Sequence, residues 1–431
     1  MEKIIVRGKN VLKGSVDIHG SKNSALPILA ACVAARGRTV IHNCPYLTDV
    51  RAALNILEYL GCEVETDGKG TVTVDSGKMS GQEIPENLMH EMRSSVIFMG
   101  ALVSRFGSAV LSSPGGCEIG LRPIDLHILS LKSLGVSIRE EHGRIYCKVK
   151  KRLKGTRIAL SFPSVGATEN IILTAISAVG VTTIINAARE PEITDLANFL
   201  NSCGAKISGA GEGTITVVGT GELSSTEYTV MPDRIEATTF MAAAAVTGGE
   251  ITVNKVNPVH VSSVIPVFEE MGCKIVSDYN SIKISAPQRL KSFSTVRTMP
   301  YPGFPTDSQA NIMAMAAYAE GTGVIIENIF ESRFKHVSEL NRMGAKINTE
   351  GRVAVIHGVK TLYGANVSST DLRGGATLIV AALGAEGETH IDNVYHIDRG
   401  YFNIEERFRN LGADICREEV YEGIRTEGSK C

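Results

Sequence analysis

A six-residue phrase recurs six times along the chain, and this repeat constrains the fold more than any other feature of the sequence. The copies are LGCEVE (60–65), LGVSIR (134–139), CGAKIS (203–208), MGCKIV (271–276), MGAKIN (343–348) and LGADIC (411–416). Their glycines follow one another at intervals of 74, 69, 68, 72 and 68 residues. Such regular spacing over the whole length indicates an internal structural repeat.

The sequence around each phrase predicts the same succession of elements. Upstream of each phrase, a second glycine closes an apolar, helix-like run and predicts a helix C-cap; these glycines are Gly37, Gly107, Gly180, Gly248, Gly321 and Gly387. Runs such as NSALPILAACVAA (23–35) are apolar on nearly every side, so we expect buried helices. Alternating strands flank Gly-containing turns after each phrase. The repeat therefore reads as β-α-β-α-β-β.

Six such units exceed what one hydrophobic core usually holds, so we expect three units in each of two domains. The all-round apolar helices predict a mixed α/β fold in which helices pack inside and sheets lie outside, an inside-out α/β barrel. The most polar candidate junction is GELSSTEYTVMPD (221–233). GAGEG (209–213) joins two predicted strands, so it does not indicate a dinucleotide-binding loop.

Composition excludes several classes of function. Lys plus Arg (44) and Asp plus Glu (46) nearly cancel, which argues against a general nucleic-acid or membrane-surface binder. The N-terminus, MEKIIVRGKN, has charges where a signal peptide needs an apolar core. The nine cysteines form no CxxC pair and no Cys/His cluster at zinc spacing. We therefore expect a cytoplasmic protein with free thiols and without a metal.

One cysteine differs from the others in its surroundings. Cys117 lies in the glycine-rich stretch SSPGGCEIGLRPID (112–125), near Arg122, whereas the phrase cysteines lie at predicted helix–strand junctions. A nearby cation and partial exposure favour the thiolate and make a thiol reactive. A tight turn that merely contains a cysteine fits the same local pattern.

Polar residues recur where the predicted apolar helices begin. They are Lys22 and Asn23, Arg93, Ser164 in the stretch Ser164-Val165-Gly166, Asp233 and Arg234, Asp307, and Asp371 with Arg373. Arg333 and Arg399 follow predicted strands, in the position that Cys117 has in its own unit. Each residue alone fits helix capping or a solvated face. Together they predict an anionic substrate held between the domains, with Asp307 as the most plausible base.

These residues lie in motifs that resemble the enolpyruvyl transferase family almost from end to end. The motifs are SKNSALPILAA, MRSSVIF, PGGCEIGLRPIDLH, SVGATEN, NAAREPEI, PDRIEATTF, FPTDSQA, IFESRFKHVSELNRMGAKI, DLRGGA and HIDRGY. The resemblance implies two pseudo-threefold domains of three repeats each, an α-β prism. It further implies a discontinuous C-terminal domain, 1–21 plus 233–431, around an N-terminal domain, 22–232.

The cysteine-containing motif is similar to the branch of the family that transfers the enolpyruvyl group of phosphoenolpyruvate to the 3′-hydroxyl of UDP-N-acetylglucosamine and releases phosphate. The resemblance implies three catalytic residues: Cys117, which donates a proton and can form an adduct, Asp307, which is the base, and Lys22. Further implied substrate-binding residues are Lys22, Asn23, Arg93, Arg122, Pro123, Ile124, Asp125, Leu126, Ser164, Val165, Gly166, Ile329, Arg333, Arg373 and Arg399. Of these, Lys22, Arg122 and Arg399 would hold phosphate. Phe162 departs from members with a lysine at this position, so the diphosphate contact could differ here.

The resemblance also implies a role in peptidoglycan synthesis, hence in cell shape and division, and sensitivity to fosfomycin. No cofactor is implied. Two alternatives remain. One is 3-phosphoshikimate 1-carboxyvinyltransferase, which typically shows a DKSxS-type motif where this chain has SKNSA. The other is a catalytically silent paralogue that binds the sugar nucleotide.

Overall fold

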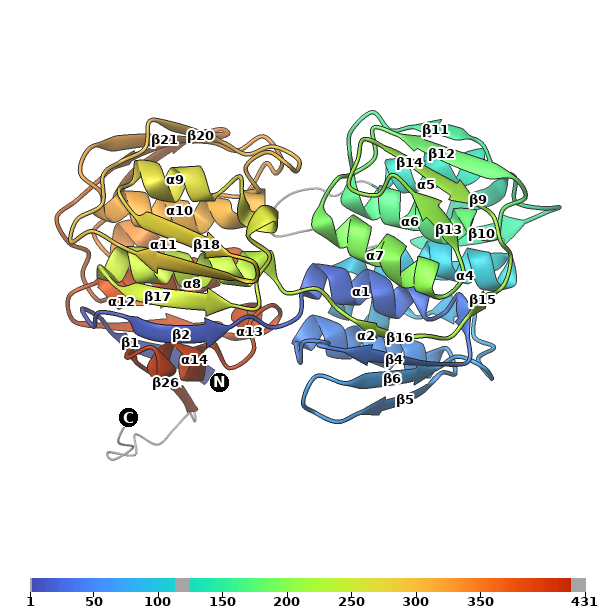
Figure 1. Ribbon diagram of the computed structural model, residues 1–431, viewed down its shortest axis with the longest axis horizontal. Helices are drawn as coiled ribbons and strands as arrows, with labels where there is room; N and C mark the ends of the chain where they lie inside the picture. The colour runs from blue at the N-terminus through green and yellow to red at the C-terminus, as the bar shows by residue number, and fades with distance from the viewer. Residues whose placement is uncertain (1, 113–123, 420–431) are drawn as a thin grey trace. The chain divides into compact units, whose positions relative to one another are not determined.

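The computed structural model describes residues 2–112 and 124–419. Within them the chain forms two compact units and passes from one to the other after His19 and after Met231 (Figure 1). We call residues 20–112 and 124–231 the N-terminal unit, and residues 2–19 and 232–419 the C-terminal unit. Each unit contains three four-stranded sheets.

The sheets of the N-terminal unit share one topology, in which a parallel edge pair is followed by two antiparallel neighbours. Their orders are β16-β4-β6-β5, β7-β8-β10-β9 and β11-β12-β14-β13. The strands are β4 (Arg38–His42), β5 (Glu63–Thr66), β6 (Val72–Asp75), β7 (Glu83–Ile84), β8 (Ser108–Ser112), β9 (Val136–Glu141), β10 (Arg144–Val149), β11 (Arg157–Ala159), β12 (Val181–Ile185), β13 (Lys206–Ser208), β14 (Thr214–Val218) and β16 (Glu227–Thr229), with β3 (Ala35–Arg36) and β15 (Leu223–Ser224) as a separate pair.

The C-terminal unit repeats this topology in the orders β18-β19-β17-β2, β20-β21-β23-β22 and β24-β25-β1-β26. The strands are β1 (Glu2–Arg7), β2 (Lys13–Asp17), β17 (Glu250–Asn254), β18 (Lys274–Asp278), β19 (Ser281–Ser285), β20 (Thr295–Arg297), β21 (Thr322–Ile326), β22 (Lys346–Glu350), β23 (Val353–His357), β24 (Asn366–Ser368), β25 (Glu388–Asp392) and β26 (Asp414–Glu419). The predicted mixed α/β fold with three repeats in each unit is thus confirmed.

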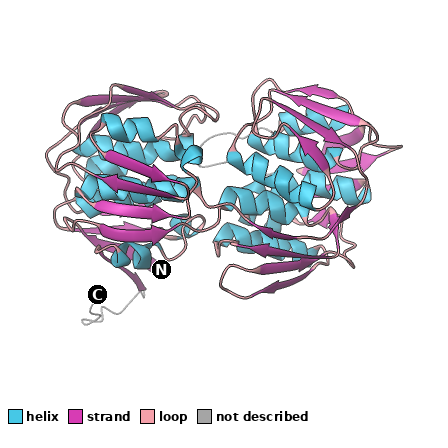
Figure 2. Cartoon of the chain, in the orientation of Figure 1, coloured by secondary structure: helices cyan, strands magenta, loops and turns pink. Residues whose placement is uncertain are grey.

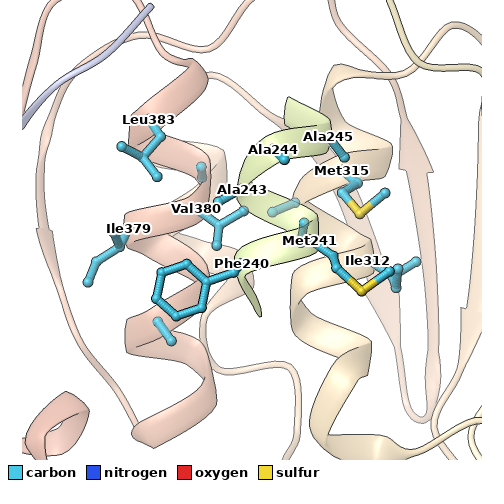
Figure 3. Close-up of a cluster of buried hydrophobic side chains, with 14 of the residues drawn as sticks. Phe240, Met241, Ala243, Ala244, Ala245, Ile312, Met315, Ile379, Val380 and Leu383 are labelled. Carbon is cyan, nitrogen blue, oxygen red and sulfur yellow. The ribbon is translucent and has the colours of Figure 1, made fainter. Parts of the chain in front are cut away.

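Helices fill the interior of each unit and strands surround them (Figure 2). The inner helices are α1 (Lys22–Ala31), α4 (Phe98–Phe106) and α6 (Val165–Ala175) in the N-terminal unit, and α8 (Arg234–Thr247), α10 (Thr306–Tyr318) and α12 (Leu372–Gly384) in the C-terminal unit. Phe240 and Met241 of α8 face Met315 of α10 and Val380 of α12, and all four side chains are fully buried (Figure 3). Burial on all sides is why these helices show no polar stripe in the sequence.

The remaining helices are shorter or amphipathic. They are α2 (Thr48–Tyr59), α3 (Glu86–Glu91), α5 (Asp125–Ser133), α7 (Pro191–Ser202), α9 (Ile265–Glu270), α11 (Val337–Arg342), α13 (Tyr395–Asp398) and α14 (Ile404–Asn410), with 3-10 turns at Arg93–Ile97 (η1) and Pro258–Val261 (η2). In the described part of the chain, no helix is both long and apolar enough to cross a bilayer.

All twelve glycines of the repeat adopt left-handed backbone angles, which explains why glycine recurs there. The predicted C-caps need a correction. Gly107 and Gly248 cap α4 and α8 directly, but the other four glycines lie a few residues beyond their helices. In those four units a short turn follows the helix before the glycine starts the next strand.

Three strands pair with parts of the chain that the repeat pattern does not predict. Strand β16 completes the first sheet of the N-terminal unit, and β2 completes the first sheet of the C-terminal unit. Strand β1 inserts between β25 and β26, where the sixth phrase lacks a second hairpin strand of its own. The N-terminal residues thus close the C-terminal unit.

Six of the described cysteines are free and buried: Cys32, Cys44, Cys62, Cys147, Cys203 and Cys273. Burial raises the pKa of Cys44, Cys62, Cys147, Cys203 and Cys273 to about 12 and that of Cys32 still further. These thiols act as small hydrophobic residues, as predicted. The expectation of a free thiol is wrong at Cys416, which forms a disulfide bond.

Candidate active site

Asp307 is held by two arginines in the C-terminal unit. It is the second residue of α10, and its side chain remains 27% exposed. Arg333 Nη2 donates a hydrogen bond to Asp307 Oδ1 at 2.6 Å, and Arg373 Nε lies 3.6 Å from the same oxygen. Both arginine side chains are almost fully buried. The carboxylate is therefore fixed from behind, with part of its surface open to solvent.

Two carboxylates that cap helix N-termini, Asp371 and Asp233, lie near Arg373. Asp371 caps α12 by accepting hydrogen bonds from the N–H groups of Arg373 and Gly374, each at 3.0 Å. Burial alone would raise the pKa of Asp371, but the charge of Arg333 and these N–H donors lower it. Asp233 caps α8 in the same way, and burial raises its pKa despite the charge of Arg373. The cap carboxylates thus differ in how readily they take up a proton.

Ile329 is joined to the start of α10 through Glu327, which is 1% exposed. Glu327 Oε1 accepts a hydrogen bond from the backbone N of Ile329 at 2.8 Å, and Oε2 accepts one from Thr306 Oγ1 at 2.9 Å. Because Thr306 precedes Asp307, the structure brings the predicted residues Ile329 and Asp307 together in one unit.

Arg399 lies at the C-terminal end of α13 and is half-buried. Two residues later, the hydroxyl of the buried Tyr401 accepts a hydrogen bond from Arg373 Nη1 at 3.2 Å. Burial tends to lower the pKa of Arg373, yet Tyr401, Asp307 and Asp233 raise it, so its guanidinium stays charged. The segment of Arg399 is thereby connected to the arginine beside Asp307.

Lys22 is the first residue of α1 in the N-terminal unit, and its side chain is nearly buried. Its ammonium nitrogen lies 3.0 Å from Asp49 Oδ2, on the first turn of α2. Asn23 follows on α1 and is half-buried. A buried ammonium beside a carboxylate has a defined direction, and the helix N-terminus at which it lies favours an anion.

The stretches Ile124–Leu126 and Ser164–Gly166 meet at the N-termini of α5 and α6. A Cβ added to Gly166 would come within 3.0 Å of the ring of His127, which directly follows Leu126. His127 Nδ1 lies 2.8 Å from Asn170 Nδ2 on α6, and burial lowers the pKa of His127 to about 4. Ser164 caps α6 by accepting a hydrogen bond from the N–H of Ala167 at 3.3 Å. A neutral imidazole thus packs the two predicted nucleotide-binding stretches together.

Some predicted site residues cannot be placed. Cys117, Arg122 and Pro123 lie outside the described residues. Arg93 begins η1, ahead of α4, and its side chain is likewise outside the description. Across residues 2–112 and 124–419, no group of three or more His, Cys, Asp or Glu side chains is arranged to hold a metal ion.

The sequence pattern missed three residues that position the others: Asp49, Glu327 and Tyr401. Asp49 resembles any acidic residue in the first turn of a helix, and Glu327 simply follows a strand. Tyr401 lies in the HIDRGY motif, next to the arginine that drew attention. None of the three has a local signal, because each acts on a residue more than 20 positions away.

The arrangement in the C-terminal unit suits proton abstraction. A partly exposed carboxylate fixed by two cations presents a defined oxygen to an approaching hydroxyl. The N-terminal unit offers a directed ammonium and two helix N-termini, which suit phosphate groups.

Comparison with known proteins identifies the family. Residues 6–408 match the family described as EPSP synthase (3-phosphoshikimate 1-carboxyvinyltransferase). The chain is 51% identical over 417 residues to UDP-N-acetylglucosamine 1-carboxyvinyltransferase 2 of Caldanaerobacter subterraneus subsp. tengcongensis, covering 97% of this chain and 100% of the relative. It is 50% identical over 420 residues to UDP-N-acetylglucosamine 1-carboxyvinyltransferase 1 of Symbiobacterium thermophilum, covering 96% and 95%.

Solved structures agree with this. The enolpyruvyl transferase NikO from Streptomyces tendae superposes with a TM-score of 0.87 at 26% identity, covering 96% of this chain and 98% of NikO. An EPSP synthase from Acinetobacter baumannii has the same fold, with a TM-score of 0.72 at 22% identity and coverage of 97% and 100%. The much higher identity to the sugar-nucleotide enzymes favours them over the shikimate enzymes. The chain therefore belongs to the EPSP synthase family of enolpyruvyl transferases, as a member of its UDP-N-acetylglucosamine 1-carboxyvinyltransferases.

Proposed function

We propose that the chain transfers the enolpyruvyl group of phosphoenolpyruvate to the 3′-hydroxyl of UDP-N-acetylglucosamine and releases phosphate. The observation that carries the proposal is Asp307, a partly exposed carboxylate clamped by Arg333 and Arg373. An alcohol attacks an enol phosphate only if a base accepts its proton, and this carboxylate is fixed to do so. Identities of 51% and 50% to enzymes named for this acceptor support the choice of substrate.

Asp307 takes the proton of the sugar hydroxyl in this reaction. Its Oδ1 accepts a hydrogen bond from Arg333, and the side chain is 27% exposed, so the substrate can approach it from the solvent side. Ile329 and the start of α10 are joined by Glu327, which keeps the nucleotide-binding loop and the base in register.

Cations stabilise the phosphate that leaves. Lys22, directed by Asp49 at the N-terminus of α1, and Arg399, beside Tyr401, are the described residues assigned to this role. Their charges oppose the negative charge that grows on the departing phosphate. Arg122 joins them in the proposal, as the motif implies.

Cys117 supplies the proton to the methylene carbon and can form an adduct with the enolpyruvyl unit. The buried free thiols cannot compete in this role, because burial raises the pKa of five of them to about 12. Fosfomycin, an epoxide phosphonate, should therefore alkylate Cys117 alone. Peptide mapping by mass spectrometry tests this, and labelling of a different cysteine would contradict the assignment.

In the cell, the proposed reaction is the first committed step of peptidoglycan synthesis, which links it to cell-wall biogenesis, cell shape and cell division. We propose that it takes place in the cytoplasm, where both substrates occur. Asn23, Arg93, Pro123, Ile124, Asp125, Leu126, Ser164, Val165 and Gly166 complete the proposed substrate-binding set.

The test is phosphate release from phosphoenolpyruvate with two alternative acceptors. We expect release with UDP-N-acetylglucosamine and none with shikimate 3-phosphate, both in the presence of a chelator. Release only with shikimate 3-phosphate would overturn the substrate assignment. Sugar-nucleotide binding without release would indicate a silent paralogue, and activity lost to the chelator and restored by metal would contradict metal-independent chemistry.

A further inference from the structure

A chain of buried hydrogen bonds runs through the interior of the C-terminal unit and ends at the arginine beside Asp307. Arg373 Nη1 donates to the hydroxyl of Tyr401 at 3.2 Å, and that hydroxyl lies 2.8 Å from Thr239 Oγ1 on α8. Thr239 is fully buried and Tyr401 is 1% exposed. The chain continues to Asn311 on α10, whose Nδ2 donates to Thr239 Oγ1 at 3.0 Å.

One assignment of donors satisfies every bond in this network. With the single hydrogen of Thr239 Oγ1 donated to the carbonyl oxygen of Ile235 at 3.0 Å, Thr239 accepts from Tyr401. Tyr401 therefore donates to Thr239, and its oxygen lone pair faces Arg373. Asn311 Oδ1 in turn accepts from Thr377 Oγ1 on α12 at 2.9 Å. All three inner helices thus fix the orientation of one tyrosine hydroxyl.

The orientation of the Tyr401 hydroxyl matters because Arg373 contacts both Tyr401 and Asp307. Its Nη1 donates to Tyr401, while its Nε lies 3.6 Å from Asp307 Oδ1. A planar guanidinium that is held at one nitrogen has little freedom at the others. Movement of the Tyr401 hydroxyl would therefore turn the guanidinium away from Asp307.

We propose that Tyr401 is a positioning residue for the reaction, which sets the orientation of Arg373 and through it the carboxylate of Asp307. This inference rests on the proposed function of Asp307 as the base. Tyr401 contacts no reacting atom in this role. Its backbone belongs to the segment of Arg399, since its N–H donates to the carbonyl oxygen of Ile397 at 3.0 Å.

The test is Tyr401→Phe, with Tyr318→Phe as a matched control. Tyr318 is another buried tyrosine of the same unit, and its hydroxyl donates to the carbonyl oxygen of Ala381 at 2.5 Å. We expect Tyr401→Phe to lower kcat about tenfold and to change the KM for UDP-N-acetylglucosamine less than twofold. Tyr318→Phe removes one buried hydrogen bond, where Tyr401→Phe removes two, and should leave both constants unchanged.

A double-mutant cycle shows whether Tyr401 acts through Arg373. In an Arg373→Lys background, the ammonium cannot bridge Tyr401 and Asp307 as the guanidinium does. Tyr401→Phe should then cost less than twofold in kcat. A full tenfold cost in that background, or a kcat of Tyr401→Phe equal to that of Tyr318→Phe, would overturn the inference.

A second variant keeps the inference testable if Tyr401→Phe does not fold. Thr239→Val preserves the shape of the side chain but removes the acceptor of the Tyr401 hydroxyl, and we expect kcat to fall about threefold. An unchanged kcat in Thr239→Val would also overturn the inference. Inactivity of the unmodified protein with both acceptors would instead refute the proposed function, so the two failures are distinguishable.

Discussion

The two units have the same scaffold but differ in the polar groups between their inner helices. Asparagine is the sixth residue of α6 in the N-terminal unit and of α10 in the C-terminal unit. Asn170 accepts a hydrogen bond from the N–H of Gly100 and contacts the neutral ring of His127. Asn311 instead joins Thr239 and Thr377, in the chain that leads through Tyr401 to the charged Arg373.

This difference separates what the repeat determines from what single residues determine. The repeat gathers helix N-termini and polar side chains at corresponding places in both units. Individual residues then decide whether such a place is neutral, as at His127, or carries arginines and a carboxylate, as at Asp307. Corresponding substitutions in the two units should therefore have different effects.

The largest expected effect is on catalysis by the C-terminal unit. Asp307→Asn keeps the size of the side chain but removes the base, so we expect kcat to fall roughly 10³-fold, within the range usual for acid–base groups. The affinity for UDP-N-acetylglucosamine, measured by calorimetry, should change less than threefold. The control is Asp414→Asn, an exposed carboxylate 3.5 Å from Arg7, which should have no effect. Equal losses in kcat and affinity would assign Asp307 to binding.

The next largest effect is on the stability of the protein at acid pH, and we expect it in both units. Burial lowers the pKa of His127, and that of His336 in the C-terminal unit, from 6.5 to about 4. A histidine whose pKa is lowered by folding contributes stability that is fully present above pH 6.5. This contribution declines as the pH falls and is lost below about pH 4. Between pH 7 and pH 5, each histidine should account for roughly 2 kcal/mol of lost unfolding free energy.

Denaturant unfolding of His127→Asn and His336→Asn at pH 7 and pH 5 measures these contributions. Each variant should lose about 2 kcal/mol less than the unmodified protein over this interval. An asparagine at 127 can still accept a hydrogen bond from Asn170. The same loss in variant and unmodified protein would show that the imidazole is not buried neutral.

A smaller effect should distinguish a buried acid in each unit. Burial, with Glu192 and Glu190 nearby, raises the pKa of Glu169 in the N-terminal unit well above its usual value, whereas that of Asp371 is lowered. A raised carboxyl pKa means that the free energy of unfolding falls as the pH rises through that pKa. Between pH 6 and pH 8, the unmodified protein should therefore lose about 1 kcal/mol of unfolding free energy relative to Glu169→Gln.

Asp371→Asn should behave in the opposite way. It weakens a charged helix cap and should cost about 1 kcal/mol at pH 7. Because the lowered pKa makes the stabilisation present above pH 3.8 and lost on further acidification, the cost should shrink at low pH. Thermal unfolding of both variants across this range compares the units. A matching pH trend in the two would mean that the acids do not differ as described.

The sequence predicted the architecture because the fold depends on features repeated six times. The repeat glycines need left-handed angles, and the apolar helices need burial, so both leave a mark at every copy. The pairing of strands β1, β2 and β16 was not predicted, because their partners lie in distant parts of the chain. Pairing between distant segments leaves no regular spacing in the sequence.

The candidate site was predicted less completely, and the reason is similar. Asp307 and Lys22 stand out because charged residues are unusual at the start of apolar helices. Glu327, Asp49 and Tyr401 do not stand out, because their role depends on which distant side chain they contact. The motif resemblance predicted which residues meet substrate, and the structure added residues that hold several of them in place.

The most direct test of the account is the structure of the product. Incubation with phosphoenolpyruvate and UDP-N-acetylglucosamine, followed by nuclear magnetic resonance of the purified sugar nucleotide, would locate any new substituent. We predict an enolpyruvyl group joined through an ether bond to the 3′-oxygen of the sugar, formed in equal amount to the phosphate released. An unmodified sugar nucleotide, or an enolpyruvyl group on any other oxygen, would contradict the account.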